Sequence, residues 1–423
     1  MSLGFFSKAE TQTSGGLPGR RGCGACGLWR ECKNPKLAAS GEGQKRILIV
    51  GEASSKAEDE RGLTSVLPNL RKHLRDMGIN VERDCRKINA VACRTPDNRD
   101  PSDSEIEACR QRVLDEIKEN PPKLILVLGN AAIKSIIGNY WRNDLHGVER
   151  WRGWTIPDRN YRAWICPTFH PAYVERMSGG DRPDNPVVDL IFRQDLERAI
   201  GCLDKKLPRY RDEASQIEIL DYAGAKAELV KVMELKNPFL FSHDYETTGL
   251  KPHAAGHRVV SASFCTTDNR AFAFQVPEQD DKALFQLWRG IMANPAIPKA
   301  AHHAKFEDNW TNVFFKTEVN GWAWDSMLTA HILDNRPKIA GLKFQYYVHF
   351  GLVGYEDEIY AYMQSDEDEE GGNGFNRMAD LIRTNPNEVL IYNGIDSLAE
   401  HRLSMLQMET LKHPLYYNIN IPF

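Results

Sequence analysis

The residues best suited to chemistry lie in three short segments of the C-terminal half of the chain. The first segment, HDYETTGL, places Asp244 and Glu246 two residues apart at the end of an apolar strand. Side chains two residues apart on a strand share a face, so these two carboxylates stand side by side. They repel each other unless a cation lies between them, and the spacing therefore predicts a divalent metal site.

Two later segments carry further acids. AHHAKFEDNW contains Glu307, which would have to approach the first pair in space, although KFED is also typical of an exposed helix start. YNGIDSLAEHRL contains Tyr392 and Asp396, which are four residues apart. On a helix these positions share a face, so a phenol and a carboxylate project together.

The cysteines suggest a second metal centre in the N-terminal half. Cys23 and Cys26 form a Cys-x-x-Cys pair, and fifteen residues separate Cys93 from Cys109. Four thiolates can hold a zinc ion or a [4Fe–4S] cluster, and composition does not separate the two. Cys32 is an alternative ligand. The other cysteines are expected to be buried: Cys85, Cys166, Cys202 and Cys265.

The elements that must position these residues predict two domains in the 423-residue chain. Strand and helix patterns alternate from Arg46 to about Cys202, with a capped helix at Asp103–Glu119, which predicts a doubly wound α/β domain. A second α/β unit contains strands at Pro238–Asp244 and Val259–Cys265. The expected divisions are a flexible tail at 1–21, a first domain at 22–203, a linker at 204–214 and a second domain at 215–423.

Composition is that of an ordinary globular protein, with 42% apolar residues and a formal net charge of −4. The charge gives no support for nucleic-acid binding, but it leaves room for a local basic groove. The sequence holds no run of eighteen apolar residues, which argues against a membrane span, and the expected location is the cytoplasm. The acidic, glycine-rich insert at 366–374 is expected to be a mobile loop.

Taken together and in this order, the three acidic segments resemble the DEDDy 3′→5′ exonucleases, most closely the proofreading domain of DNA polymerase I. The similarity runs from about Ser215 to Phe423, and WAWDSMLTAHIL, with Asp325, resembles a further helix of that family. The resemblance implies an RNase H-like fold, a mixed sheet flanked by helices. It also implies that the enzyme removes nucleoside monophosphates from DNA, mainly from single-stranded 3′ ends.

The same resemblance implies roles for individual residues. Asp244, Glu246 and Asp396 would bind two Mg²⁺ or Mn²⁺ ions, of which one activates a water and the other stabilises the leaving 3′ oxygen. Tyr392 would position that water. Glu307 stands where the family has Asp, and its extra methylene moves the carboxylate by about 1.5 Å, which an acid acting through bound water could absorb. The DNA-contacting positions would be Leu250, Phe306 and His303, the last in place of the usual Asn.

The N-terminal half resembles the iron–sulfur uracil-DNA glycosylases of family 4, over about Gly22 to Cys202. The resemblance rests on the cysteine pattern, on Gly-Glu-x at Gly51 and on an HPAY segment at His170. It implies that Asn89 reads the uracil edge and that His170 contacts the flipped nucleotide. The implied cluster ligands are Cys23, Cys26, Cys93 and Cys109.

Two departures from the glycosylase pattern bear on activity. Ser54 and Ser55 replace the Pro-Gly of the first motif, and Ser65 takes the place of the Phe that stacks on uracil. Loss of one base–aromatic stack costs about 1–3 kcal/mol, in addition to the cost of flipping the base. We therefore expect this domain to bind DNA with lost or altered catalysis. The basic residues that could meet phosphates are Arg71, Lys72, Arg75, Arg150 and Arg152.

The joining of these two modules resembles the front portion of some phage family A DNA polymerases. The chain is expected to be an ancillary nuclease or part of a longer polymerase, with a polymerase domain or subunit as partner. Two alternatives stay open. One is a dual enzyme that also excises uracil, and the other is a non-catalytic module that binds single-stranded DNA.

Overall fold

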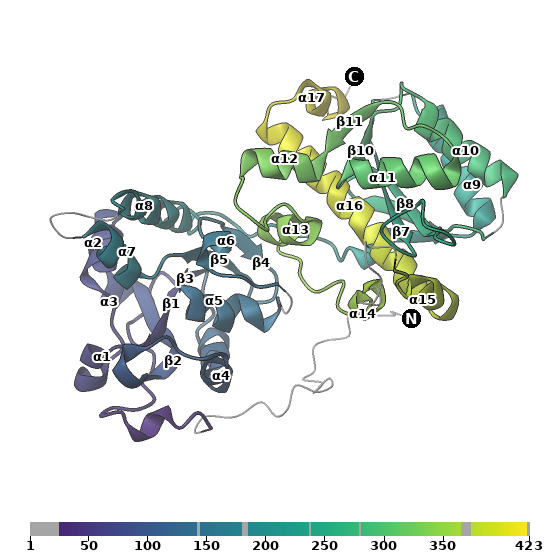
Figure 1. The fold of residues 1–423 in the computed structure, drawn as a ribbon. Coiled ribbons are helices and arrows are strands. Elements are labelled where there is room, and N and C mark those ends of the chain that lie inside the picture. Colours follow the sequence, from purple (N-terminus) through teal and green to yellow (C-terminus); the bar gives the residue numbers. More distant parts are fainter. Residues whose placement is uncertain are drawn as a thin grey trace. The chain divides into compact units, whose positions relative to one another are not determined.

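The computed structural model describes residues 25–141, 144–179, 185–236, 238–278, 281–364 and 374–420. The chain forms two compact units, one of Met1–Pro208 with Tyr347–Val353 and the other of Arg209–Tyr346 with Gly354–Phe423 (Figure 1). The change from the first unit to the second at residue 208 falls inside the stretch expected to be a linker. The expected tail at 1–21 and nearly all of the insert at 366–374 lie outside the described residues.

The N-terminal unit is built on a five-stranded sheet of order β2-β1-β3-β5-β4 (Figure 1). Neighbouring strands run parallel except for the antiparallel edge strand β4. The apolar runs predicted as buried strands form its centre, and the sheet confirms the predicted doubly wound α/β class. The strands are β1 (Ile47–Ser54), β2 (Cys85–Arg94), β3 (Leu124–Leu128), β4 (Ile156–Asp158) and β5 (Ala163–Thr168).

Helices connect these strands and bury their apolar faces against the sheet. Helix α4 (Asp103–Glu119) begins as predicted, at a capping box. The Ser102 hydroxyl accepts a hydrogen bond from the backbone amide of Glu105, and the Glu105 carboxylate accepts one from the backbone amide of Ser102. The other helices of this unit are α1 (Lys56–Arg61), α2 (Pro68–Asp76), α3 (Val81–Asp84), α5 (Asn130–Ile136), α6 (Val148–Trp151), α7 (Pro171–Ser178) and α8 (Val187–Ile200), with 3₁₀ turns at Leu28–Arg30, Pro96–Asn98 and Ile137–Asn139.

The C-terminal unit contains a mixed six-stranded sheet of order β11-β10-β7-β8-β9-β6. The central strands β7, β8 and β9 form an antiparallel meander, and the outer pairs are parallel. Strand β7 continues three residues beyond the expected end at Asp244, because its pairing with β8 extends to Thr247. The strands are β6 (Ile217–Leu220), β7 (Phe241–Thr247), β8 (Val259–Thr267), β9 (Arg270–Gln275), β10 (Lys299–Ala301) and β11 (Trp322–Asp325).

The long helix α16 (Pro386–Thr410) packs across β7, β8 and β9 (Figure 1). Gly394 permits this close approach, since a Cβ atom there would lie 2.3 Å from Cγ2 of Ile217 on β6. The flanking helices confirm the RNase H-like class. They are α9 (Tyr222–Glu234), α10 (Lys282–Ala293), α11 (Ala304–Trp310) with a π-helical turn at Thr311–Phe315, α12 (Ser326–Leu333), α14 (Tyr360–Met363), α15 (Met378–Thr384) and α17 (Pro414–Asn420). Helix α13 (Leu342–Phe350) belongs to this unit up to Tyr346 and to the N-terminal unit from Tyr347.

Within the described parts of the chain, none of the helices combines the length and apolar character that crossing a membrane requires.

Asp158 on β4 gives the N-terminal unit a pH-dependent stability. It is 1% exposed, accepts from the Tyr161 amide at 2.7 Å and the Tyr347 hydroxyl at 3.0 Å, and burial raises its pKa from 3.8 to about 6. Because the pKa of Asp158 is higher in the folded protein, this group stabilises the fold fully below pH 3.8, the pKa of an ordinary aspartate. That stabilisation is lost as the pH rises through 6.

The neutral variant Asp158→Asn should escape this loss. Its stability advantage over the natural protein is expected to be about 2 kcal/mol larger at pH 8 than at pH 4. Urea denaturation at the two pH values measures the difference, with Asp76→Asn, which removes an exposed carboxylate, as the control. An Asp158→Asn effect that is equal at both pH values would contradict the assignment.

Candidate functional site

Three carboxylates meet where β7 lies against α16. Asp244, Glu246 and Asp396 each offer one oxygen, and these atoms all lie within 4.8 Å of one another. The two-residue spacing on β7 puts Asp244 and Glu246 on one face, and α16 brings Asp396 to it. Among the described residues, no other group of three or more acidic, histidine or cysteine ligand atoms is this close. Carboxylate oxygens are the ligands that Mg²⁺ and Mn²⁺ prefer.

The negative charge of these three close carboxylates favours a bound cation. Burial, followed by repulsion from neighbouring acids, raises the pKa of Asp244 and Glu246 well above their ordinary values. The Lys343 ammonium opposes this shift and pairs with Asp396 Oδ1. Asn393 donates to Asp244 Oδ2 at 2.7 Å. One ammonium does not neutralise three carboxylates, whereas divalent cations would.

Glu307, on α11, acts electrostatically on this group without belonging to it. It is 2% exposed, and Asp244 is the charge that, after burial itself, most raises its pKa. Its Oε2 atom has no hydrogen-bond partner among the described residues. This burial excludes the exposed helix start that KFED alone would also fit. Asp308, the neighbouring acid, points elsewhere and accepts from Trp322 Nε1 at 3.1 Å.

Tyr392 lies one helical turn before Asp396 and is 3% exposed. Burial and the nearby charges of Asp396 and Glu246 raise its pKa well above 10, so the phenol keeps its proton and can act as a donor. The Lys343 Nζ atom lies 4.3 Å from the ring centroid of Tyr392 and 4.3 Å from that of Tyr355. Tyr355 also donates to Asp396 Oδ1 at 2.6 Å.

Sequence reasoning did not identify three residues of this site, Lys343, Tyr355 and Asn393. Lys343 lies on α13 and Tyr355 in the segment after it, and neither stands at a spacing that points to Asp396. Their approach depends on how α13 packs against α16. Asn393 follows Tyr392 directly, so the motif contained it without marking a role for it.

In the N-terminal unit, a second set of polar residues gathers at the carboxyl ends of the parallel strands. A Cβ atom on Gly129 would lie 2.5 Å from Glu52 Oε1 and 3.0 Å from His170 Cβ, so Glu52 and His170 meet there. Asn89 Oδ1 lies beside Gly51, since a Cβ atom added to Gly51 would be 2.4 Å from it. This edge is where open α/β sheets bind ligands.

Protonation states in this second site are set by burial. Burial lowers the pKa of His170 to about 4, so its imidazole is neutral near pH 7 and Nδ1 accepts from the Ala172 amide at 3.3 Å. Burial raises the pKa of Glu52 above its ordinary value. Titratable groups with shifted pKa values that lie close to other polar residues are typical of functional sites.

Glu58, which sequence reasoning missed, lies beside Asn89. Its Oε1 atom accepts from the Ser65 amide at 2.8 Å and lies 3.4 Å from Asn89 Nδ2. Its Oε2 atom accepts from the Ser55 amide at 2.8 Å, which makes a capping box for α1. The Ser-x-x-Glu spacing was the available signal for this cap.

Three cysteines of the predicted second metal centre lie within the described residues and share one apolar region. Cys93 and Cys109 are 4% and 7% exposed in one apolar cluster, and Cys26 and Cys32 pack against it. The Lys36 amide donates to Cys93 Sγ at 3.3 Å, and burial raises the pKa of that thiol to about 11. Cys23 lies outside the described residues. The expected burial of the remaining cysteines is confirmed for Cys85, Cys166, Cys202 and Cys265.

Comparison with known families assigns both units. Residues 39–191 match the uracil DNA glycosylase superfamily, and residues 219–352 match the 3′-5′ exonuclease domain of type A DNA polymerases. The type-4 uracil-DNA glycosylase of Sulfurisphaera tokodaii is 33% identical over 163 residues, which cover 36% of this chain and 70% of that protein. The chain belongs to the uracil-DNA glycosylase superfamily and carries a polymerase-type 3′-5′ exonuclease domain. The expected resemblances are thereby confirmed.

Two polymerases match the chain over larger parts of its length. The DNA polymerase of Bacillus phage SP01 is 24% identical over 424 residues, which cover 92% of this chain and 43% of the polymerase. DNA polymerase I of Chloroflexus aurantiacus is 27% identical over 220 residues, which cover 50% of this chain and 22% of that protein. This chain therefore spans less than half the length of either polymerase.

The positions expected to contact DNA in the exonuclease domain differ in accessibility. Leu250 is 69% exposed just beyond β7. Phe306 is partly buried against the apolar core, and His303 stacks on it with ring centroids 6.3 Å apart. His303 also has a left-handed backbone with φ of 80° where α11 begins. Asp325 caps α12 by accepting from the Met327 and Leu328 amides, both at 3.0 Å.

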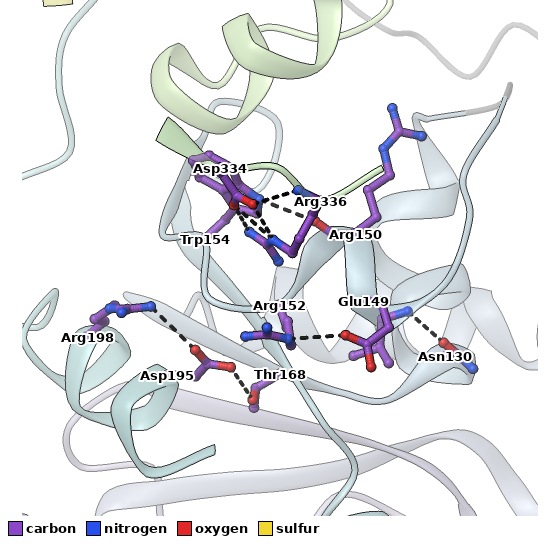
Figure 2. Close-up of polar contacts among 11 residues, drawn as sticks. Asn130, Glu149, Arg150, Arg152, Trp154, Thr168, Asp195, Arg198, Asp334 and Arg336 are labelled. Carbon is purple, nitrogen blue, oxygen red and sulfur yellow. Dashed lines mark hydrogen bonds and ion pairs between the residues drawn. The ribbon is translucent and has the colours of Figure 1, made fainter. Parts of the chain in front are cut away.

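Two of the basic residues expected to meet phosphates, Arg150 and Arg152, are engaged within the protein. Arg150 is 7% exposed, and its guanidinium lies 5.4 Å and 5.5 Å from the ring centroids of Trp141 and Trp151. Arg152 donates to Glu149 at 3.3 Å (Figure 2). The suggestion that Arg150 meets phosphates is therefore wrong, because the fold buries its side chain among aromatic rings.

Proposed function

We propose that the C-terminal domain is a metal-dependent 3′→5′ DNA exonuclease that releases nucleoside monophosphates, mainly from single-stranded 3′ ends. The observation that carries this proposal is the group of half-buried Asp244 with buried Glu246 and Asp396, whose ligand oxygens lie within 4.8 Å of one another. Such a group is unfavourable without cations and suited to them. We also propose that the domains extend over 22–203 and 215–423, joined by a linker at 204–214.

Each residue of the acidic site has its own role in the proposed hydrolysis. Asp244, Glu246, Glu307 and Asp396 hold two Mg²⁺ or Mn²⁺ ions, which when bound would activate a water and stabilise the leaving oxygen. Tyr392, which keeps its proton, donates a hydrogen bond that orients the water. Leu250 and Phe306 pack against the terminal bases, and His303 is a further DNA-contacting residue.

The glycosylase-like domain serves in this proposal to bind DNA, with weak or absent uracil excision. Ser65 supplies no aromatic ring to stack on a base, and its amide engages Glu58, whose carboxylate lies 3.4 Å from the Asn89 amide nitrogen. A base edge would have to compete with that carboxylate for Asn89. Such a domain would hold the exonuclease, and a polymerase domain or subunit, on the template.

A dual repair enzyme is the second candidate, because Asn89, His170 and Glu52 gather at one sheet edge. An abasic-site assay on a uracil-containing oligonucleotide distinguishes it. Cleavage at the uracil position after alkali would establish excision, and an intact strand would support the binding role.

We further propose that Cys23, Cys26, Cys93 and Cys109 hold a [4Fe–4S] cluster, with zinc as the alternative. The natural protein should then be brown and carry about four irons per chain. Cys93→Ala is expected to remove most of the bound metal, because Cys93 is buried in one cluster with Cys109, and Cys26 packs against that cluster. Metal analysis measures this loss, and Cys265→Ala, a buried cysteine elsewhere, should keep full occupancy. Unchanged metal in Cys93→Ala would exclude that ligand.

The test of the main proposal is digestion of a 5′-labelled single-stranded oligonucleotide with Mg²⁺ or Mn²⁺, with and without chelator. A ladder that shortens from the 3′ end and disappears with chelator is the expected result. No shortening with either metal would favour the non-catalytic DNA-binding role.

A further inference from the structure

A fifth acid lies beside the proposed metal site, one helical turn beyond Asp396. Tyr392, Asp396 and Glu400 follow one another at four-residue spacing along α16, so their side chains share one face of the helix. Glu400 is 0% exposed. No step of the proposed function uses it.

The described residues around Glu400 compensate its burial only weakly. Neither carboxylate oxygen has a hydrogen-bond partner of normal geometry within the described part of the chain. The His302 amide faces it, and the charges that act on it most are those of Asp244 and Asp325. Burying an ionised carboxylate without compensation costs free energy, and a cation bound beside it would offset that cost.

Glu307 is the second side chain in the same situation. Its Oε2 atom has no partner among the described residues, and it is 2% exposed. The acids acting on it are, in order, Asp244, Glu400 and Glu246. The charge of Asp244 therefore acts on both Glu307 on α11 and Glu400 on α16, and the charge of Glu400 acts on Glu307.

The charge balance points to two ions. The Lys343 ammonium pairs with Asp396 and acts on Asp244 and Glu246. Five carboxylates with one ammonium leave four negative charges, which two divalent cations would balance. The carboxylates are Asp244, Glu246, Glu307, Asp396 and Glu400.

We propose that Glu400 is a positioning acid for the second divalent ion, which it holds together with Asp244 and Glu307. Asp244, Glu246 and Asp396 hold the first ion. Glu307 and Glu400 lie outside the group of oxygens within 4.8 Å, so they act through the water shell that hard cations retain. The inference rests on the proposed function, since it concerns the metal site of that reaction.

The test is a titration of the full-length chain with Mn²⁺, followed by the paramagnetic resonance signal of the free ion, in the absence of DNA. The natural protein should bind two ions. Glu400→Gln should keep the first and bind the second at least about tenfold more weakly, as loss of an outer-shell partner does. Glu409→Gln makes the same change at an exposed position of the same helix and should bind both ions normally.

A purely structural role for Glu400 predicts a different result. Glu400→Gln would then lower the melting temperature in chelator and leave Mn²⁺ binding unchanged, which overturns the proposal. The proposal expects a melting temperature in chelator that is equal or higher, because an uncompensated buried charge is removed. Glu400→Asp, which keeps the charge on a shorter stem, should weaken the second ion by less than Glu400→Gln if both variants fold.

The outcome separates this inference from the proposed function. Two ions in the natural protein and a weakened second ion in Glu400→Gln, with no DNA cleavage, would support the role of Glu400 and remove the exonuclease proposal. DNA cleavage by the natural protein, together with unchanged Mn²⁺ binding in Glu400→Gln, would support the exonuclease proposal and overturn the role of Glu400.

Discussion

Asp244→Asn should lower the exonuclease rate by about 10³-fold or more, which corresponds to about 4 kcal/mol of lost transition-state stabilisation. Asp244 belongs to the close group of ligand oxygens and is also the acid nearest in effect to Glu307 and Glu400. The substitution keeps the side-chain shape and an oxygen that can accept from Asn393, so the fold should be retained. Only the charge that holds the ions is lost.

Single-turnover digestion of a labelled oligonucleotide measures this effect, together with Mn²⁺ binding to the same preparation. Asp308→Asn is the matched control, because Asp308 is a nearby acid that bonds to Trp322 and takes no part in the group. It should digest DNA at close to the natural rate. If Asp244→Asn kept more than a tenth of the activity, the site would have been assigned to the wrong residues.

Tyr392→Phe should reduce the rate by about 10²-fold, the effect typical of removing a positioned proton donor. The ring remains, so its contact with the Lys343 ammonium at 4.3 Å and its packing on α16 persist. Mn²⁺ affinity should therefore be unchanged. Since the pKa of Tyr392 lies well above 10, the rate of the natural enzyme should show no fall between pH 7 and 9 from ionisation of this phenol.

Steady-state rates across that pH range, with Mn²⁺ titrations of each protein, test the assignment. Tyr360→Phe, which removes a hydroxyl from a 37% exposed tyrosine, should leave both quantities unchanged. A Tyr392→Phe protein that lost metal affinity along with rate would indicate that the hydroxyl supports the acids and does not act on the water.

Periodicity predicted much of the fold and most of the acidic group. The two-residue spacing on β7 and the four-residue spacing on α16 determine which side chains share a face, whatever the rest of the fold does. The same argument applied once more would have reached Glu400, which stands four residues after Asp396. The approach of Lys343 depends instead on tertiary packing of α13, for which the sequence carries no periodic signal.

The glycosylase-like site shows where sequence reasoning stops for a different reason. The loss of the aromatic side chain at Ser65 was visible in the sequence. The consequence that the Ser65 amide binds Glu58, and that Glu58 lies beside Asn89, depends on how the loop before α2 folds back. Loop conformations of this kind follow from local hydrogen bonds that composition does not specify.

The close approach of α16 to the sheet has a consequence for genetics. Gly394 lies between Tyr392 and Asp396, and any side chain there would push against Ile217 and displace the helix that carries both. A random-mutagenesis screen for loss of nuclease activity should therefore recover Gly394 alongside the acids, although it has no functional group. Variation at this position would report on the distance between two layers of the fold, and second-site suppressors would be expected at Ile217.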